Sequence, residues 1–253
     1  DRSAFSEATA NAAVFDGEPL RPYNTQPDAL LINFKTLVMT FTPDSASGRA
    51  RVRSEPPLAG VQVDDSAPLL PSAPCGDWRT DLRASVGSPS RVQFLGSYAS
   101  ACGERVWPSA YVDPSSFAAR AIEGSWRLLG GLLTGQVRDA TVSELAMLRS
   151  RGTLSGNTSP LRLESPSLPL LDIVRDVNKF SNNVMAQHLL LSLGLHAKLG
   201  QPQAGTFEAG RAAAQAWWLQ TLPASAPPVL DNGSGLSRSG RITARSLAAM
   251  LQH

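Results

Sequence analysis

The pattern of apolar and polar positions changes character along the 253 residues of the chain. Between positions 170 and 194, apolar side chains recur every three or four residues, which predicts two amphipathic helices. A polar junction at residues 178–183 (NKFSNN) interrupts this apolar stretch. Amides and hydroxyls in such a setting are costly to bury without partners, so the junction needs an explanation. One explanation is that Ser181 caps the second helix by accepting a hydrogen bond from a backbone N–H.

The first half of the chain has the pattern of β-structure. Two runs rich in branched and aromatic residues, 30–34 and 36–41, predict strands. Residues 49–53 (RARVR) alternate charged with small apolar side chains, as a strand with one solvated face does. Shorter strand candidates follow among Pro- and Ser-rich segments, including residues 78–86. We therefore expect residues 38–114 to form a small β-rich domain.

Helical patterns dominate the second half. Beyond the two helices above, further helices are expected at residues 115–130, at residues 205–222, and after Thr243, a suitable capping residue. Brief strands are expected at residues 135–142 and 161–165. Strands in the first half and helices in the second half indicate units of unlike fold class.

Composition narrows the class of protein. The chain is 42% hydrophobic and 17% charged with a net charge of +2, which suits a folded core and gives no support to nucleic-acid binding. No apolar run reaches the length of about 18 residues that a membrane span needs, so no transmembrane segment is expected. The sequence has no signal peptide and starts at Asp1, so we expect it to begin at a processed or truncated end.

Cys75 and Cys102 are the only cysteines. The three histidines are remote from them in sequence, so no metal site is expected. The two cysteines lie in a loop-rich region, where a disulfide between them would contribute about 3–4 kcal/mol in the chain-entropy model. We favour a disulfide, and hence an oxidising compartment, over two free thiols, which the count alone leaves open.

Several catalytic systems have no sequence signature here. No serine has the glycines of a G-x-S-x-G elbow, and the G-x-G-x-x-G and P-loop lysine motifs are missing. Residues 231–235 (DNGSG) contain too few carboxylates for a calcium loop. The sequence therefore predicts no cofactor and no metal.

One catalytic system fits the polar junction. Active-site-serine penicillin-recognising enzymes use S-x-x-K, S-x-N and K-T-G motifs. Residues 181–183 (SNN) have the S-x-N form between two predicted helices, and residues 231–238 (DNGSGLSR) follow downstream. With these two motifs in this order, the chain resembles the D-alanyl-D-alanine carboxypeptidase/endopeptidase family. These are the class C low-molecular-mass penicillin-binding proteins of peptidase family S13. Most members have DGSGLS at the second motif, whereas this chain carries Asn232 between the Asp and the Gly.

The resemblance implies a fold and a domain organisation. It implies a mixed α/β protein, consisting of the mainly helical portion of a penicillin-binding/β-lactamase-like transpeptidase domain with inserted β-rich domains. Residues 1–37 then start an inserted second domain, and residues 38–114 form a β-rich third domain that holds both cysteines, a pair typical of some members. Residues 115–160 return through the second domain, and residues 161–253 form the helical portion of the transpeptidase-like domain.

The resemblance also implies residue roles. In the family the S-x-N serine relays a proton between the nucleophile's leaving group and the lysines, and the asparagine amide holds the substrate's peptide carbonyl; these roles fall to Ser181 and Asn183. In the family an acidic residue of the inserted domain recognises the free amine of diaminopimelate. Asp16 and Glu18 are candidates for this residue. The alternative is that each is simply a solvated carboxylate in a turn. The implied partners are peptidoglycan stem peptides, with β-lactams as inhibitors, and the implied location is the periplasm.

Two of the three motifs are absent. None of the three lysines, Lys35, Lys179 and Lys198, has a serine three residues before it, and none is followed by Thr-Gly or Ser-Gly. In the family these motifs lie before the region matching Asp1 and after the region matching His253, so we expect an internal fragment that cannot be acylated by itself. The expected function is that of a serine-type D-Ala-D-Ala carboxypeptidase/endopeptidase. The alternative is a non-catalytic cell-wall binding or architectural module.

Overall fold

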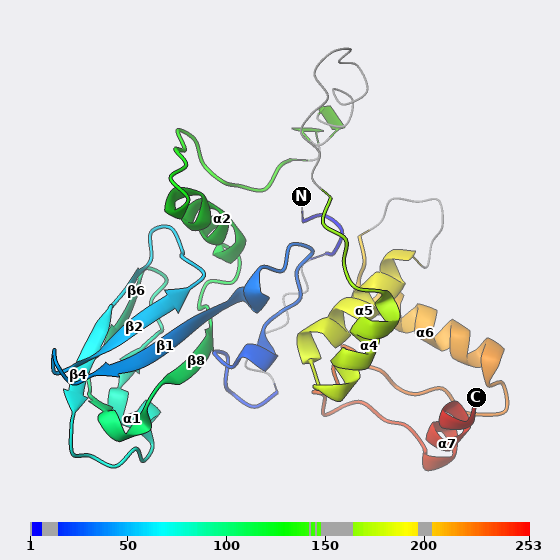
Figure 1. The fold of residues 1–253 in the computed structure, drawn as a ribbon. Helices are drawn as coiled ribbons and strands as arrows, with labels where there is room; N and C mark the ends of the chain where they lie inside the picture. The colour runs from blue at the N-terminus through cyan, green and yellow to red at the C-terminus, as the bar shows by residue number, and fades with distance from the viewer. Residues whose placement is uncertain (1, 7–14, 142, 145, 148–163, 197–203) are drawn as a thin grey trace. The chain divides into compact units, whose positions relative to one another are not determined.

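The computed structural model describes residues 2–6, 15–141, 143–144, 146–147, 164–196 and 204–253 (Figure 1). The chain divides into two compact units, which are described separately. The helical unit comprises Asp1–Thr9, Pro27–Leu30 and Arg138–His253, and the sheet unit comprises Ala10–Gln26 and Leu31–Val137. No helix in the described ranges is long and apolar enough to cross a membrane.

The sheet unit contains two sheets. The larger has the strand order β7-β4-β2-β1-β8, and the smaller has the order β3-β6-β5 (Figure 1). The larger sheet is built from β1 (Thr36–Asp44), β2 (Arg49–Glu55), β4 (Ser66–Leu70), β7 (Tyr98–Ala99) and β8 (Arg105–Ala110). The smaller sheet is built from β3 (Gln62–Val63), β5 (Ala84–Ser85) and β6 (Arg91–Phe94). This arrangement confirms the predicted β-rich character of the region.

The β1–β2 hairpin forms as its alternating pattern predicts. Phe41 on β1 is opposite Val52 on β2, and both face the core, whereas Thr42 and Arg51 form the next pair and face solvent. Because side chains alternate between the two faces of a strand, a slip of one residue would bury the charged side chains of β2. The hairpin turn is stabilised by the Asp44 carboxylate, which accepts a hydrogen bond from the backbone N–H of Ala46 at 3.1 Å.

Aromatic side chains and one disulfide hold the centre of the sheet unit. Phe41 stacks on Tyr98 with ring centroids 5.6 Å apart, and Trp78 meets both rings edge-on. Aromatic pairs at these separations add to the free energy gained by burying their area. The predicted disulfide is present between Cys75 and Cys102.

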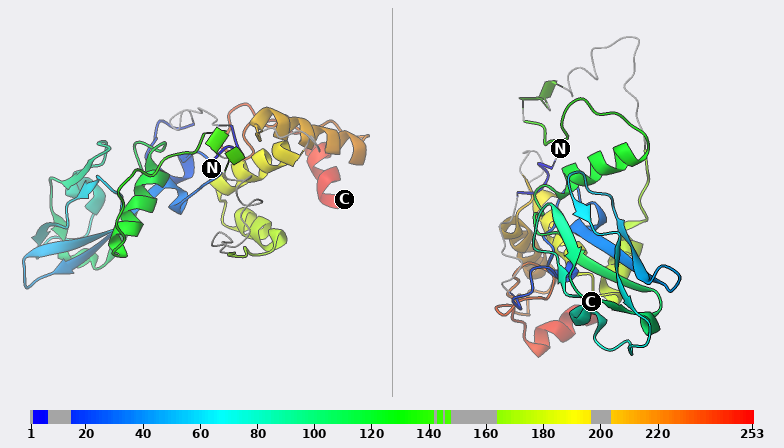
Figure 2. Two further views of the ribbon diagram at one scale, coloured as in Figure 1. Left: turned by 90° about the horizontal axis from the view of Figure 1, so that it is seen from above. Right: turned by 90° about the vertical axis from the view of Figure 1, so that its left-hand side faces the viewer.

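Helix α2 (Phe117–Leu128), which confirms the helix expected from residue 115, lies beside the strands of the sheet unit (Figures 1 and 2). It buries Phe117 and Ala121 in the same core as the aromatic cluster. The backbone of Pro57 approaches Gly124 so closely that a side chain there would collide with it. Gly124 therefore allows α2 and the chain after β2 to make contact.

Two predicted strands are wrong, and a third forms only in part. Residues 30–34 form no strand, because Asn33, Phe34 and Lys35 adopt positive φ angles of 44°, 53° and 49°. The Asn33 amide donates to the Thr36 carbonyl oxygen at 2.8 Å, a local side-chain bond that competes with strand pairing. Most of 78–86 is a helix, α1 (Trp78–Leu82), since Asp77 caps its N-terminus, and only Ala84–Ser85 (β5) form a strand. Residues 135–141 have no regular structure.

The helical unit consists of α4 (Leu170–Lys179), α5 (Asn183–His196), α6 (Phe207–Thr221) and α7 (Ala244–Gln252). Thr206 and Thr243 cap α6 and α7, each accepting a hydrogen bond from the backbone N–H three residues on. These helices confirm the helical pattern of the second half. The strand expected at 161–165 lies largely outside the described residues, and its described part, 164–165, is not a strand.

Helices α5 and α6 lie side by side in a close contact that depends on glycine (Figure 2). A Cβ atom at Gly194 of α5 would lie 2.7 Å from the carbonyl oxygen of Thr206. A Cβ atom at Gly210 of α6 would overlap the carbonyl oxygen of Leu190. Trp218 of α6 is only 3% exposed. The absence of two side chains thus sets the distance between the two helix backbones.

Phe5 and Asp28, from two segments near the N-terminus, both contact His188 of α5 within the helical unit. The backbone N–H of Asp28 donates to Nε2 of His188 at 3.1 Å, and Phe5 meets the His188 ring edge-on. The Asp28 carboxylate in turn pairs with the Arg2 guanidinium at 2.9 Å. Because Nε2 of His188 accepts a hydrogen bond, the neutral imidazole form fits this contact.

Candidate active site

Helix α4 ends in a Schellman motif at the polar junction. The N–H of Ser181 donates to the carbonyl oxygen of Asn178 at 3.4 Å, and the N–H of Asn182 donates to that of Val177 at 2.9 Å. Between these bonds Ser181 has a φ angle of +51°, in the left-handed region. Glycine is the usual residue at this position, because it has no Cβ to clash with the backbone.

Ser181 is therefore a strained residue with an exposed side chain. An L-residue in the left-handed region costs about 1–2 kcal/mol relative to the right-handed helix. Within the described part of the chain the Ser181 hydroxyl makes no hydrogen bond that would offset this cost. The two backbone bonds of the Schellman motif account for the left-handed conformation, whereas the exposed hydroxyl is left without a role in the fold of the described residues.

Asn182, and not Ser181, caps α5. Its Oδ1 accepts a hydrogen bond from the backbone N–H of Met185 at 3.0 Å. The expectation that Ser181 caps the second helix is therefore wrong. The reason is geometric: Ser181 is the left-handed residue of the Schellman motif after α4, one residue before the position from which a side chain reaches the first N–H groups of α5.

Asn183 begins α5 and is half-buried. Its amide makes no side-chain hydrogen bond to any other residue in the described ranges, and the same is true of the Ser181 hydroxyl. The fold thus uses the middle residue of the Ser-Asn-Asn motif for capping. The outer two residues are left with polar groups that can serve a ligand.

The DNGSG loop lies against α5. A Cβ atom at Gly233, whose φ angle is +81°, would be 3.0 Å from the Cβ of Leu190 and 3.3 Å from the carbonyl oxygen of Ala186. Positions 183, 186 and 190 share one face of a helix, because they are spaced by three and four residues. The loop therefore lies along the face of α5 that begins with Asn183.

Short side chains hold this loop in one conformation. Oδ1 of Asn232 accepts from both the N–H and the hydroxyl of Ser234, at 3.0 and 2.7 Å, and the Ser234 hydroxyl oxygen accepts from the N–H of Leu236 at 3.1 Å. Arg211 of α6 donates to the Asp231 carbonyl oxygen at 2.9 Å. Asn232, which departs from the family's usual motif, thus has a structural role that sequence reasoning missed.

Asp16 lies in the sheet unit and is bound within its own turn. Its carboxylate accepts hydrogen bonds from the Tyr23 hydroxyl at 2.7 Å and from the Asn24 amide at 2.8 Å. The bond from Tyr23, together with those from the Glu18 N–H and the Asn24 amide, holds the pKa of Asp16 below its ordinary value. Asp16 is therefore a fixed, exposed anion, and its role in reading an amine stays a prediction.

The described residues offer little other catalytic chemistry near the junction. Lys179 is exposed, with Nζ 5.6 Å from the centroid of the neighbouring Phe180 ring. Phe180, the one apolar residue of the junction, is 71% exposed. Among described residues, no group of three or more His, Cys, Asp or Glu side chains is arranged to hold a metal ion.

Removing the cap should weaken the junction. We expect Asn182→Ala to lower the free energy of unfolding of the chain by about 1 kcal/mol, because the N–H of Met185 loses its acceptor. Asn182→Asp retains an acceptor oxygen and should stay within a few tenths of a kcal/mol of the wild type. Chemical denaturation of the three proteins measures the difference. Equal losses in both variants would contradict the capping role.

The fold of this chain is similar to that of two solved structures, in agreement with the resemblance found in the sequence. The chain matches penicillin binding protein 4 (dacB) from Haemophilus influenzae with a TM-score of 0.62 and 18% identity, covering 100% of this chain and 52% of that one. The same Haemophilus influenzae protein in complex with a novel β-lactam matches with a TM-score of 0.52 and 18% identity, covering 89% and 48%. At this identity the likeness shows a shared fold.

The chain spans about half the length of these proteins. A comparison with curated protein sequences returned no match. The family model of the D-Ala-D-Ala carboxypeptidase 3 (S13) family, in contrast, matches residues 1–253. This match covers the strained serine, the capped helix and the glycine loop alike, and the chain belongs to the D-Ala-D-Ala carboxypeptidase 3 (S13) family.

Proposed function

We propose that the protein is a serine-type D-Ala-D-Ala carboxypeptidase/endopeptidase that acts on peptidoglycan stem peptides through an acyl-enzyme and is inhibited by β-lactams. The observation that carries the proposal is the helix junction. Ser181 is held in a strained conformation with its hydroxyl exposed, and the Asn183 amide follows it on the other side of a capping residue. Family membership supports the same reaction class.

In the proposed reaction Ser181 moves a proton and Asn183 orients the substrate. A hydroxyl both donates and accepts, so Ser181 passes a proton between the leaving group and a basic lysine. The Asn183 amide donates a hydrogen bond to the substrate's peptide carbonyl and fixes the scissile bond for attack. Because the sequence has neither S-x-x-K nor K-T-G, the proposal assigns the nucleophile and its lysines to parts of the protein outside these 253 residues.

Penicillin labelling tests this assignment. We expect a fluorescent penicillin to label the full-length protein covalently and to leave the chain of residues 1–253 unlabelled, because acylation needs the S-x-x-K serine. The control is the full-length protein with that serine replaced by alanine, which should also stay unlabelled. Stable labelling of the 253-residue chain would contradict the proposal.

The rival is a non-catalytic cell-wall binding or architectural module. The missing nucleophile motif favours it for this chain taken by itself. Translating the flanking coding sequence separates the two readings, since the enzyme requires S-x-x-K upstream and K-T-G downstream. If both are absent there, the binding module replaces the enzyme.

We also propose that the protein works in the periplasm. The Cys75–Cys102 disulfide supports this location, because structural disulfides persist in oxidising compartments and are rare in the cytosol. Asp16, a fixed exposed carboxylate, is proposed to recognise the free amine of the stem peptide.

A further inference from the structure

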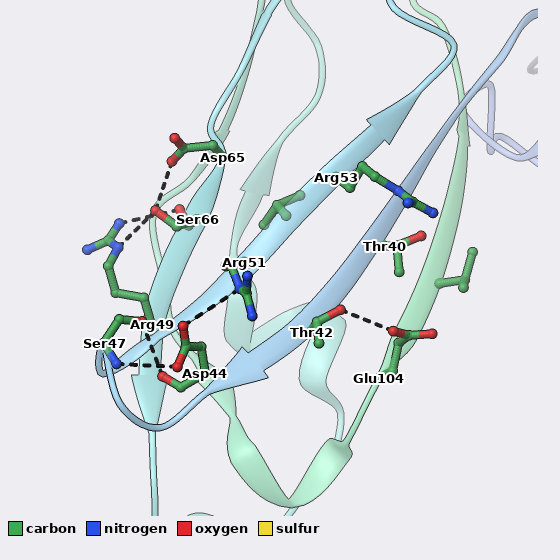
Figure 3. A pocket seen from close by; sticks show the side chains of 12 residues that line it. Thr40, Thr42, Asp44, Ser47, Arg49, Arg51, Arg53, Asp65, Ser66 and Glu104 are labelled. Atoms are coloured by element: carbon green, nitrogen blue, oxygen red, sulfur yellow. Dashed lines mark hydrogen bonds and ion pairs between the residues drawn. The ribbon is translucent and has the colours of Figure 1, made fainter.

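The solvent face of the larger sheet carries a row of arginines. Arg49, Arg51 and Arg53 alternate along β2 and point away from the core, since Ala50 and Val52 between them point inwards. Figure 3 shows the three side chains on β2, with Arg49 turned towards Ser66 and Arg51 towards Asp44. They line an open depression with a volume of about 960 Å³. We call this surface the arginine face.

The depression exists because the arginines have short neighbours. On β1, Thr40 is opposite Arg53 and Thr42 is opposite Arg51, and on β4 Ser66 is opposite Arg51. Hydroxyl side chains on both flanking strands are much shorter than a guanidinium-bearing one, so the arginine heads stand above a floor of hydroxyl groups and the apolar side chain of Val106. A ligand on this face would therefore meet guanidinium and hydroxyl donors together.

Most of the guanidinium donors have no protein partner among the residues that the structure describes. Nε of Arg49 donates to the Ser66 hydroxyl at 2.8 Å, Nε of Arg51 is 3.7 Å from Asp44, and Nε of Arg53 is 3.4 Å from Glu55. Each guanidinium has five N–H groups, so within the described residues most of them point to solvent. The Arg51 and Arg53 side chains are 73% and 76% exposed.

Carboxylates surround the row and limit what it can bind. Asp44, Asp65 and Glu104 also line the depression, so its formal charges balance. The backbone N–H of Ser47 holds the pKa of Asp44 below its usual range, and Glu104 accepts from the Thr42 hydroxyl at 3.1 Å. A balanced face gives a polyanion such as nucleic acid no long-range attraction. It complements a ligand that carries carboxylates and an amine together.

We infer that the arginine face is a second, non-catalytic binding site for peptidoglycan stem peptides, in which Arg51 and Arg53 pair with peptide carboxylates and the acidic rim accepts the free amine. The choice of ligand rests on the proposed function, because stem peptides carry both kinds of group. Arginines two residues apart on a strand are about 6.8 Å apart, a spacing that successive carboxylates on an extended peptide can match. Arginine pairs with carboxylates through two parallel N–H bonds.

Calorimetric titration of the 253-residue chain with a synthetic stem peptide, its carboxylates and amine free, tests the site. Arg51→Gln/Arg53→Gln should weaken binding about tenfold, equivalent to about 1.4 kcal/mol. The matched control is Arg127→Gln/Arg175→Gln, which removes two exposed arginines of α2 and α4 and should bind like the wild type. A peptide with amidated carboxylates should bind weakly to all three proteins and should not distinguish them.

Three outcomes overturn the inference. These are no binding to the wild-type chain, equal binding by the wild type and the Arg51/Arg53 variant, and an equal loss in the control variant. An Asn183→Ala chain is titrated in parallel. If Asn183→Ala abolishes binding and the Arg51/Arg53 variant does not change it, the peptide binds only at the proposed catalytic motif, and the inference fails while the proposed function stands.

Discussion

Replacing Ser181 with alanine in the full-length protein is expected to lower the rates of β-lactam acylation and of D-Ala release by roughly 10²–10⁴-fold, the usual contribution of a positioned proton-transfer group. The stability of the folded protein should hardly change. Alanine has a Cβ like serine, so the cost of the left-handed conformation stays, and the hydroxyl forms no hydrogen bond with the described residues that could be lost.

Ser181→Gly is the matched variant that separates strain from chemistry. Glycine adopts a φ angle of +51° without steric cost, so this variant should raise the free energy of unfolding by about 0.5–1 kcal/mol. Its activity should fall as far as that of Ser181→Ala, because both lack the hydroxyl. Equilibrium unfolding and acylation kinetics of the two variants measure the two effects independently. A stable, fully active Ser181→Gly protein would show that the hydroxyl has no catalytic role.

The predicted elements that formed are those in which one pattern dominates. The alternation of Arg49, Ala50 and Arg51 leaves only one register in which the charges stay in water, and the β1–β2 hairpin adopts it. Thr206 and Thr243 precede clear helical periodicity, and both act as caps. Where a segment is short and its own side chains bond to its backbone, as at Asn33, pattern and structure diverge.

At the candidate site, too, the sequence does not determine the structure, and here the uncertainty concerns a single residue, the N-cap of α5. The S-x-N motif points to Ser181 and Asn183 as candidates. Because Ser and Asn are almost equally good N-caps, the sequence Ser-Asn-Asn does not show which residue caps α5. The decision depends on where α4 ends, since its Schellman motif places Ser181 in the left-handed region and leaves the capping position to Asn182. The left-handed conformation, which leaves the Ser181 hydroxyl exposed, is visible only in the backbone.

The close contact of α5 and α6 could not be predicted, because a single sequence does not show which residue meets a glycine. Gly210 faces the backbone of Leu190, and Leu190 lies on the face of α5 that begins with Asn183. The positions of Asn183, the proposed substrate-binding residue, and of the DNGSG loop, which also contacts Leu190, therefore depend on the absence of a side chain at Gly210 of α6.

Whether Gly210→Ala raises or lowers the free energy of unfolding tests this dependence. In an open helix the change would stabilise by about 1 kcal/mol, because alanine is the better helix former. Here the added Cβ would overlap the Leu190 carbonyl oxygen, a backbone atom that cannot rotate away. We therefore expect the free energy of unfolding to fall by about 3 kcal/mol, with faster amide hydrogen exchange in α5 and α6.

Gly235→Ala is the matched control, because it also replaces a glycine by alanine but creates no close contact. A Cβ at Gly235 would have no atom within 4 Å, although its φ angle is +79°, so Gly235→Ala should lose only about 1 kcal/mol, from backbone strain. In the full-length protein Gly210→Ala should also slow β-lactam acylation, because α5 must shift to accept the methyl group and Asn183 shifts with it. If Gly210→Ala is instead stabilising and acylates at the wild-type rate, the two helices do not hold Asn183 through this contact.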